Sequence, residues 1–224
     1  MGGFISSGDA AVFINERSEC IHQVRKHRLR LLPFPVGVGI IISITRWEEH
    51  LMILLVIDMQ KALVVEDLYA FDAFLDSTVR LVGAARKNGV EVVFVQHDAG
   101  AGSGLSVGDE GFEIIDALRP EAEEKVYVKS INSCFGNKDF KAYMERQEDK
   151  RLMIIGLQTN YCIDATVKSA FERGFDVIIP EGSNSTFDNA YMTGETTVRY
   201  YNEDVWEELV DSVTLEEAIE MMEH

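Results

Sequence analysis

The stretch RLMIIGLQTNYCIDATVKSAFERGFDVIIP, residues 151–180, reads as a strand, a helix and a second strand. Its two ends, RLMIIG and FDVIIP, are short apolar runs with β-branched residues, which is typical of strands buried on both faces. Between them, apolar side chains recur at steps of three and four, and Arg173-Gly174 provides a helix stop signal. This order predicts two parallel strands joined by a right-handed crossover.

The same alternation extends toward the N-terminus of this unit. Three further apolar runs resemble buried strands: MILLVID at 52–58, VEVVFVQ at 90–96 and KVYV at 125–128. Strands that alternate with helices form a parallel sheet, because each crossover helix packs back onto the sheet. We therefore predict an α/β fold, a doubly wound, mostly parallel sheet of about six strands with helices on both faces, in three Rossmann-like layers.

Helical periodicity separates these strands. Apolar residues at steps of three and four precede the stop signal Asn88-Gly89, namely Leu68, Phe71, Leu75, Val79 and Val82. Asn137 is placed to cap a second helix. We expect the segment from about Asn189 onward to be helical.

The composition excludes several classes of protein. The 224 residues include 38 acidic and 21 basic side chains, for a net charge of -17. Phosphate binding relies on clustered Lys and Arg, so we expect no nucleic-acid partner. The three cysteines, Cys20, Cys134 and Cys162, have neither the number nor the spacing of a disulfide framework or a thiolate metal site. A reducing cytoplasm fits this usage best.

Residues 1–51 differ in kind from the rest. They contain an apolar run at 36–45 that is too short to span a membrane, so we expect no membrane partner. Trp47-Glu48-Glu49 is encoded by TGG-GAR-GAR, which can contain a purine run on which bacterial ribosomes land. We expect 1–51 to be an N-terminal extension translated from an upstream leader, with Met52 as the physiological start of a single domain, 52–224. The alternative is a genuine N-terminal arm, and N-terminal mass spectrometry of the native protein distinguishes the two.

Reactive side chains follow the predicted strands directly. Asp58 ends the first run, His97 follows the second, Lys129 follows the third, and Cys162 lies in the turn after RLMIIG. In a parallel α/β sheet, ligands bind beyond the carboxyl ends of the strands. We therefore expect these groups to meet at one rim, although each alone also fits a structural role as a cap, a solvated strand end or a small core residue.

Three segments are similar to the isochorismatase-like hydrolase family, specifically to its cysteine hydrolases. They are LLVIDMQ at 54–60, VKSINSCF at 128–135 and GLQTNYCIDATVKSAFERGFDV at 156–177. The resemblance implies that Asp58, Lys129 and Cys162 are the catalytic residues. It also implies the parallel sheet predicted above and, because oligomers are common in the family, a homo-oligomer.

The resemblance further implies a specific backbone at the nucleophile. The peptide bond between Leu157 and Gln158 would be cis, and backbone N–H groups near Cys162 would form an oxyanion hole. A helix N-terminus and the Lys129 ammonium would favour the thiolate form of Cys162. Asp58 would take the thiol proton, pass it to the leaving amine, and then activate water to cleave a thioester. We therefore expect hydrolysis of the carbon–nitrogen bond of a small amide, with no cofactor.

His97 bears on a metal-dependent alternative. Nicotinamidases of this family bind a metal through an aspartate and two histidines near the second strand. Here His97 and Asp98 are present, but no further histidine occurs before His224. We therefore expect no metal site of the usual form, and a nicotinamidase with unusual metal ligands stays as an alternative. Cys162 argues against the vinyl-ether hydrolysis of true isochorismatases.

The sequence gives less information about the residues that line the substrate pocket than about the catalytic residues. The candidate pocket residues are Gln60, His97, Phe135, Tyr161 and Phe187. Cys134 we interpret as packing or pocket wall, and the glycine-rich loop at 98–111 as a surface loop or a lid. An aspartyl-phosphate phosphatase would use Asp58 as its nucleophile and need a second acidic residue at position 60, where this sequence has Gln60, so this alternative is disfavoured. The remaining alternative is a non-catalytic binding or assembly module of the same fold.

Overall fold

Seven parallel strands form the centre of the fold in the computed structural model, which describes residues 52–223. Their order is β3-β2-β1-β4-β5-β7, and the short β6 pairs with β4. The strands are β1 (Ile53–Ile57), β2 (Glu91–His97), β3 (Lys125–Lys129), β4 (Arg151–Leu157), β5 (Asp176–Pro180), β6 (Asn184–Ser185) and β7 (Val210–Val213). The chain winds outward in one direction from β1 and in the other from β4, so the topological switch point lies between these two strands.

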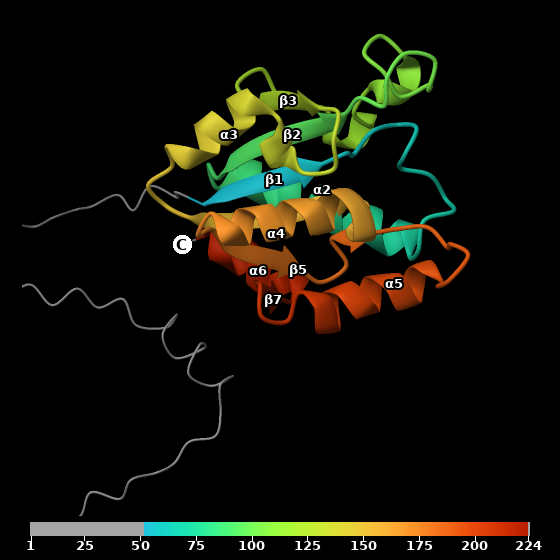
Figure 1. Ribbon diagram of the computed structural model, residues 1–224. Coiled ribbons are helices and arrows are strands. Elements are labelled where there is room, and N and C mark those ends of the chain that lie inside the picture. Colours follow the sequence, from blue (N-terminus) through green and yellow to red (C-terminus); the bar gives the residue numbers. More distant parts are fainter. Residues whose placement is uncertain (1–51, 224) are drawn as a thin grey trace, which may run out of the picture. The chain divides into compact units, whose positions relative to one another are not determined.

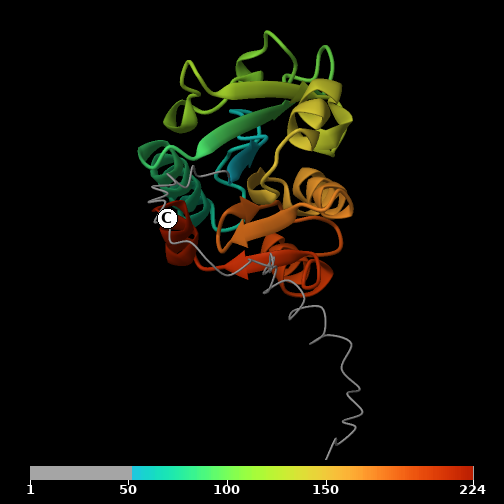
Figure 2. The ribbon, with the colours of Figure 1, turned by 90° about the vertical axis from the view of Figure 1, so that its left-hand side faces the viewer.

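Helices cover both faces of this sheet. They are α2 (Phe71–Lys87), α3 (Lys138–Glu145), α4 (Asp164–Glu172), α5 (Gly194–Tyr200) and α6 (Leu215–Glu223). Short 3-10 turns occur at η1 (Glu110–Phe112), η2 (Asp116–Leu118) and η3 (Cys134–Gly136), and π-helical turns at η4 (Thr159–Ile163) and η5 (Tyr201–Val205). Figure 2 shows α2 and α6 on one face and α3, α4 and α5 on the other. The predicted doubly wound α/β fold is confirmed.

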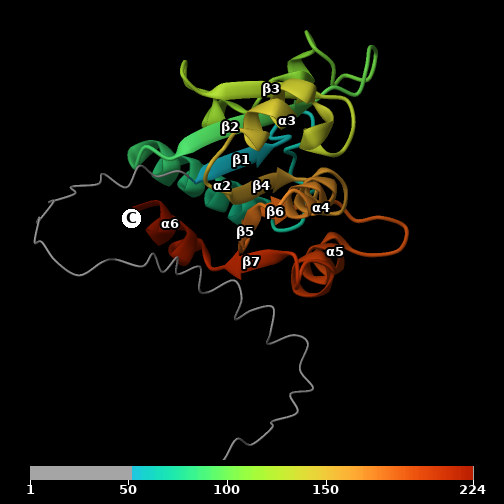
Figure 3. The ribbon, with the colours of Figure 1, turned by 60° about the vertical axis from the view of Figure 1, so that its left-hand side comes forward.

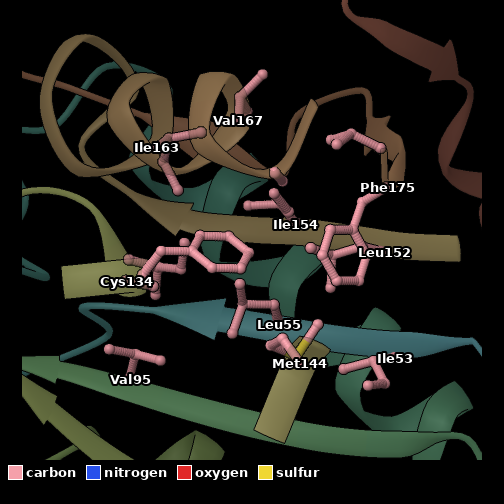
Figure 4. Close-up of a cluster of buried hydrophobic side chains, with 14 of the residues drawn as sticks. Ile53, Leu55, Val95, Cys134, Met144, Leu152, Ile154, Ile163, Val167 and Phe175 are labelled. Carbon is pink, nitrogen blue, oxygen red and sulfur yellow. The ribbon is translucent and has the colours of Figure 1, made fainter. Parts of the chain in front are cut away.

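Two hydrophobic clusters hold the layers together. Along β1, Ile53 and Leu55 point into the cluster beneath α3 and α4, whereas Leu54 and Val56 point into the cluster beneath α2 and α6. Figure 4 shows Ile163 and Val167 directed from the helical layer onto the strands. Because both faces of β1 are buried, the strand has no polar alternation, which explains its continuous apolar run.

The buried face of α2 differs from the predicted stripe. Val79, a member of the predicted stripe, is 36% exposed. The buried face of α2 instead includes Phe74, Thr78, Leu81 and Ala85. The predicted stripe is correct at Val82, which is buried, but it omits Phe74 and Leu81; the hydroxyl side chain of Thr78 interrupts the apolar pattern of the true face. Leu68 is buried, but it lies before the helix begins.

The C-terminal part contains a strand as well as helices. The expectation of helix from about Asn189 onward is wrong for Val210–Val213, which is β7 and pairs with β5. This strand forms one edge of the sheet, and Asp211 and Ser212 are exposed. The strand, VDSV, therefore lacks the apolar run that marks β1 or β4. Figure 3 shows β7 at the outer side of the sheet.

No helix among residues 52–223 has the length and apolar character needed to cross a membrane. The expectations for the leader at 1–51 and for Cys20 lie outside the described residues.

Candidate active site

The three predicted catalytic side chains meet at the carboxyl ends of the strands. Asp58 follows β1, Lys129 is the last residue of β3, and Cys162 lies in η4, directly after β4. The Lys129 Nζ atom is 2.8 Å from Asp58 Oδ2 and 3.1 Å from Cys162 Sγ. Figure 1 shows the arrowheads of β1 and β2 directed toward the same end of the sheet. One acid, one ammonium and one thiol are therefore in mutual contact.

The backbone of Asp58 turns sharply away from the sheet. Its φ of 53° lies in the left-handed region, which aspartate tolerates better than most residues. Its N–H still donates to the Val95 carbonyl at 2.8 Å, so the turn is anchored to β2. The side chain is 2% exposed, and Oδ1 has no hydrogen-bond partner among the described residues. The carboxylate thus has one oxygen bound to Lys129 and one oxygen available.

The Lys129 ammonium has three acceptors. Besides Asp58 and Cys162 it contacts His97 Nδ1 at 3.2 Å, and its side chain is fully buried. An ammonium has three hydrogens and no acceptor capacity. His97 Nδ1 must therefore accept, which requires a neutral imidazole with its hydrogen on Nε2.

Burial dominates the protonation of this cluster. Burial and the Asp58 carboxylate raise the pKa of the Cys162 thiol to about 12, although Lys129 acts in the opposite direction. These contributions favour the thiol form of Cys162 over the expected thiolate. The expectation weighed the positive charges near the sulfur but omitted the cost of burying an anion and the nearby carboxylate.

The same environment shifts the pKa values of Asp58 and Lys129. Burial raises the pKa of Asp58 above its ordinary value, and Lys129 only partly offsets this. For Lys129, burial disfavours the charged form, but Asp58 and two cysteines outweigh it and the pKa rises. The site therefore combines a cation, a thiol whose pKa is raised and a carboxylate with an increased proton affinity, an arrangement that suits proton transfer from Cys162 to Asp58.

Hydrogen bonds with the segment at 183–186 hold the turn that carries Cys162. The Leu157–Gln158 peptide bond is cis. Thr159 donates to Asn184 Oδ1 at 2.7 Å, and Thr186 donates to Asn160 Oδ1 at 2.7 Å. All four residues of the polar run SNST, which follows the apolar strand β5, are buried.

Gly156 allows this turn to approach β1. Its φ is +118°, and a Cβ at this position would lie 2.0 Å from the Ile57 carbonyl oxygen. We expect Gly156→Ala to lower the free energy of unfolding by roughly 3 kcal/mol, measured by urea denaturation, because the backbone must shift. The matched control is Gly83→Ala in α2, where no atom lies within 4 Å of the added Cβ. That change should stabilise by about 0.5–1 kcal/mol, and equal losses for both variants would contradict the assignment.

Two of the predicted pocket residues make structural contacts. Gln60 is fully buried, and its side chain bonds only backbone groups: Nε2 donates to the carbonyls of His97 and Phe112, and Oε1 accepts from the His97 N–H. Phe135 packs edge to face on Phe140 within the core. The Gln60 side chain is thus committed to backbone hydrogen bonds and the Phe135 ring to core packing, so a role in the pocket stays a prediction for both.

The other three candidates differ in exposure. Tyr161 is 51% exposed in η4, and His97 is half-buried against Lys129. Phe187 is half-buried and packs against the cluster beneath α2. Cys134 is fully buried in the core, as the packing interpretation expects.

Asn132 lies next to Cys162 and was not predicted from the sequence as a site residue. Its Oδ1 is 4.0 Å from Cys162 Sγ, and its side chain is exposed. Its signal was its position three residues after Lys129, in the connection that leaves β3. An exposed amide beside the sulfur can orient a polar substrate.

His97 should make stability depend on pH. Burial and Lys129 lower the pKa of His97, while Asp58 and Asp98 only partly oppose them. Below the unfolded value near 6.5, the unfolded chain therefore binds more protons, and stability falls as pH falls through the folded pKa. We expect wild type to lose unfolding free energy relative to His97→Gln between pH 7 and 5. Parallel urea curves at every pH would contradict this.

Comparison with known proteins gives one consistent result. A family model for the isochorismatase domain matches residues 52–198. An isochorismatase family protein of Bacillus subtilis is 31% identical over 112 residues, 49% of this chain and 62% of that protein. Streptothricin hydrolase of Streptomyces noursei is 29% identical over 60% of this chain and 50% of that protein. Ureidoacrylate amidohydrolase of Yersinia enterocolitica is 26% identical over 53% of this chain and 68% of that protein.

The chain thus spans about half to two thirds of the length of these relatives. Among solved structures, a cysteine hydrolase from Pseudomonas syringae superimposes with a TM-score of 0.69 at 21% identity, covering 88% of this chain and 99% of that one. A likeness at this identity supports the shared fold.

Proposed function

The chain belongs to the isochorismatase family of hydrolases, and from this premise we propose that it cleaves the carbon–nitrogen bond of a small amide through a thioester on Cys162. The observation that carries the proposal is the contact of Lys129 Nζ with both Asp58 and Cys162, at 2.8 and 3.1 Å. Two relatives, a streptothricin hydrolase and a ureidoacrylate amidohydrolase, support the reaction class.

Acylation begins with the thiol proton. As Cys162 Sγ attacks the amide carbon, its proton moves to Asp58, whose burial has raised its proton affinity. The carbonyl becomes an oxyanion, which backbone N–H groups of the 157–162 turn would stabilise. Asp58 then gives this proton to the amide nitrogen, the carbon–nitrogen bond breaks, and the amine leaves.

Deacylation uses the same carboxylate. Asp58 takes a proton from water, the hydroxide adds to the thioester, and the carbon–sulfur bond breaks as the acid forms. The sulfur recovers its proton from Asp58, so the site returns to its starting state. Lys129 stays charged throughout, because it balances Asp58 or the departing thiolate at each stage.

A panel of small amides tests this function. Ammonia or amine release identifies a substrate, and intact mass of rapidly quenched protein should show an acyl adduct on Cys162. Hydrolysis without any adduct, by a protein that requires added zinc or iron, would instead favour a metal-assisted nicotinamidase. A panel without turnover or adduct would favour a non-catalytic module.

A further inference from the structure

Three different ligand types surround the Lys129 ammonium. The carboxylate of Asp58 lies at 2.8 Å, the sulfur of Cys162 at 3.1 Å and the imidazole Nδ1 of His97 at 3.2 Å. Potential ligand atoms of these three residues all lie within 4.8 Å of one another. A carboxylate, a thiolate and an imidazole are the ligands that zinc takes in proteins, and three of them leave a fourth position open.

We propose that Asp58, His97 and Cys162 form a latent site for zinc or a similar soft divalent ion, which the Lys129 ammonium keeps closed. The ammonium occupies the place that the metal would take. This site is independent of the proposed hydrolysis, since it depends only on the positions of the ligand atoms.

The distances allow a metal with small movements. Zinc bonds oxygen and nitrogen at about 2.0–2.2 Å and sulfur at about 2.3 Å. An ion at the position of Nζ would therefore need each ligand atom to move inward by roughly 1 Å. Asp58 Oδ1 is buried without a partner among the described residues, so the carboxylate has an oxygen that a metal could take.

The charges also balance. In the site as it stands, one carboxylate faces one ammonium. A dication would displace the thiol proton and face a carboxylate and a thiolate, which again gives no net charge. With the ammonium in place, however, the dication would lie beside a buried positive charge, and this repulsion excludes it.

Removal of the lysine side chain tests the proposal, with cobalt as the spectroscopic probe for zinc. We expect Lys129→Ala to bind one cobalt ion per chain, with a sulfur-to-cobalt charge-transfer band, and on the order of 100-fold more tightly than wild type. Adding Cys162→Ala or His97→Ala to this variant should abolish the band or weaken binding at least tenfold. Adding Cys134→Ala should leave it intact, because that cysteine is buried in the core.

Failure of the alanine variant to fold is itself informative. The variant leaves the Asp58 carboxylate buried without its cation, and a bound metal would supply the missing charge. Refolding that succeeds with cobalt and fails with a chelator supports the site. A chain that stays unfolded with cobalt, or a folded chain that binds none, overturns it. Loss of hydrolytic activity in the amide panel would leave these outcomes unchanged.

Discussion

Cys162→Ala is expected to lower kcat/KM for any cleaved amide by about 10⁴-fold or more, with no acyl adduct in the mass spectrum. In the proposed mechanism the sulfur forms the covalent intermediate, and no other nucleophilic side chain lies in contact with both Lys129 and Asp58 among the described residues. The fold should be unaffected, because alanine removes one atom from a side chain that is 7% exposed.

The matched control is Cys134→Ala. Cys134 is also a buried free cysteine near Lys129, but its own contacts are with the core, and its N–H donates to Thr166. We expect activity to be retained with a stability loss of about 1 kcal/mol, measured by urea denaturation. If the two alanine variants lost activity equally, the nucleophile would be misassigned.

Asp58→Asn should damage both activity and stability. The amide cannot take the thiol proton, so we expect kcat to fall by roughly 10²–10⁴-fold. The Lys129 ammonium would then be buried without its anion, which costs about 3–5 kcal/mol in unfolding free energy. Steady-state kinetics and urea denaturation measure the two effects separately.

A double variant separates the two effects further. Asp58→Asn with Lys129→Met removes both charges and should regain part of the lost stability, since an uncharged pair avoids the burial of a lone ion. Activity should stay lost. Asp98→Asn at the same rim is the surface control and should change little, because this side chain bonds only its own loop. Recovery of activity in the double variant would exclude Asp58 as the base.

Much of the fold could be predicted from the sequence because burial on both faces leaves a local mark. The apolar runs at β1, β2 and β4 appear in the sequence as continuous blocks. β7 leaves no such mark, since an edge strand exposes Asp211 and Ser212. The true face of α2 includes Thr78, which a search for apolar periodicity passes over.

The location of the site could be predicted from the sequence, whereas the protonation states of its side chains could not. The ends of parallel strands lie at one rim, which brings Asp58, Lys129 and Cys162 together from sequence order alone. The protonation of the sulfur depends on how deeply all three are buried, which no local pattern reports. The roles of Gln60 and Phe135 likewise depend on neighbours from distant segments.

Four adjacent strands each supply one member of the cluster: β3 gives Lys129, β2 gives His97, β1 leads to Asp58 and β4 leads to Cys162. These groups become neighbours only when the middle of the sheet has assembled. A partly folded chain therefore contains an ordinary cysteine and separate solvated charges. The proton transfer proposed from Cys162 to Asp58 is therefore available only in the finished tertiary structure.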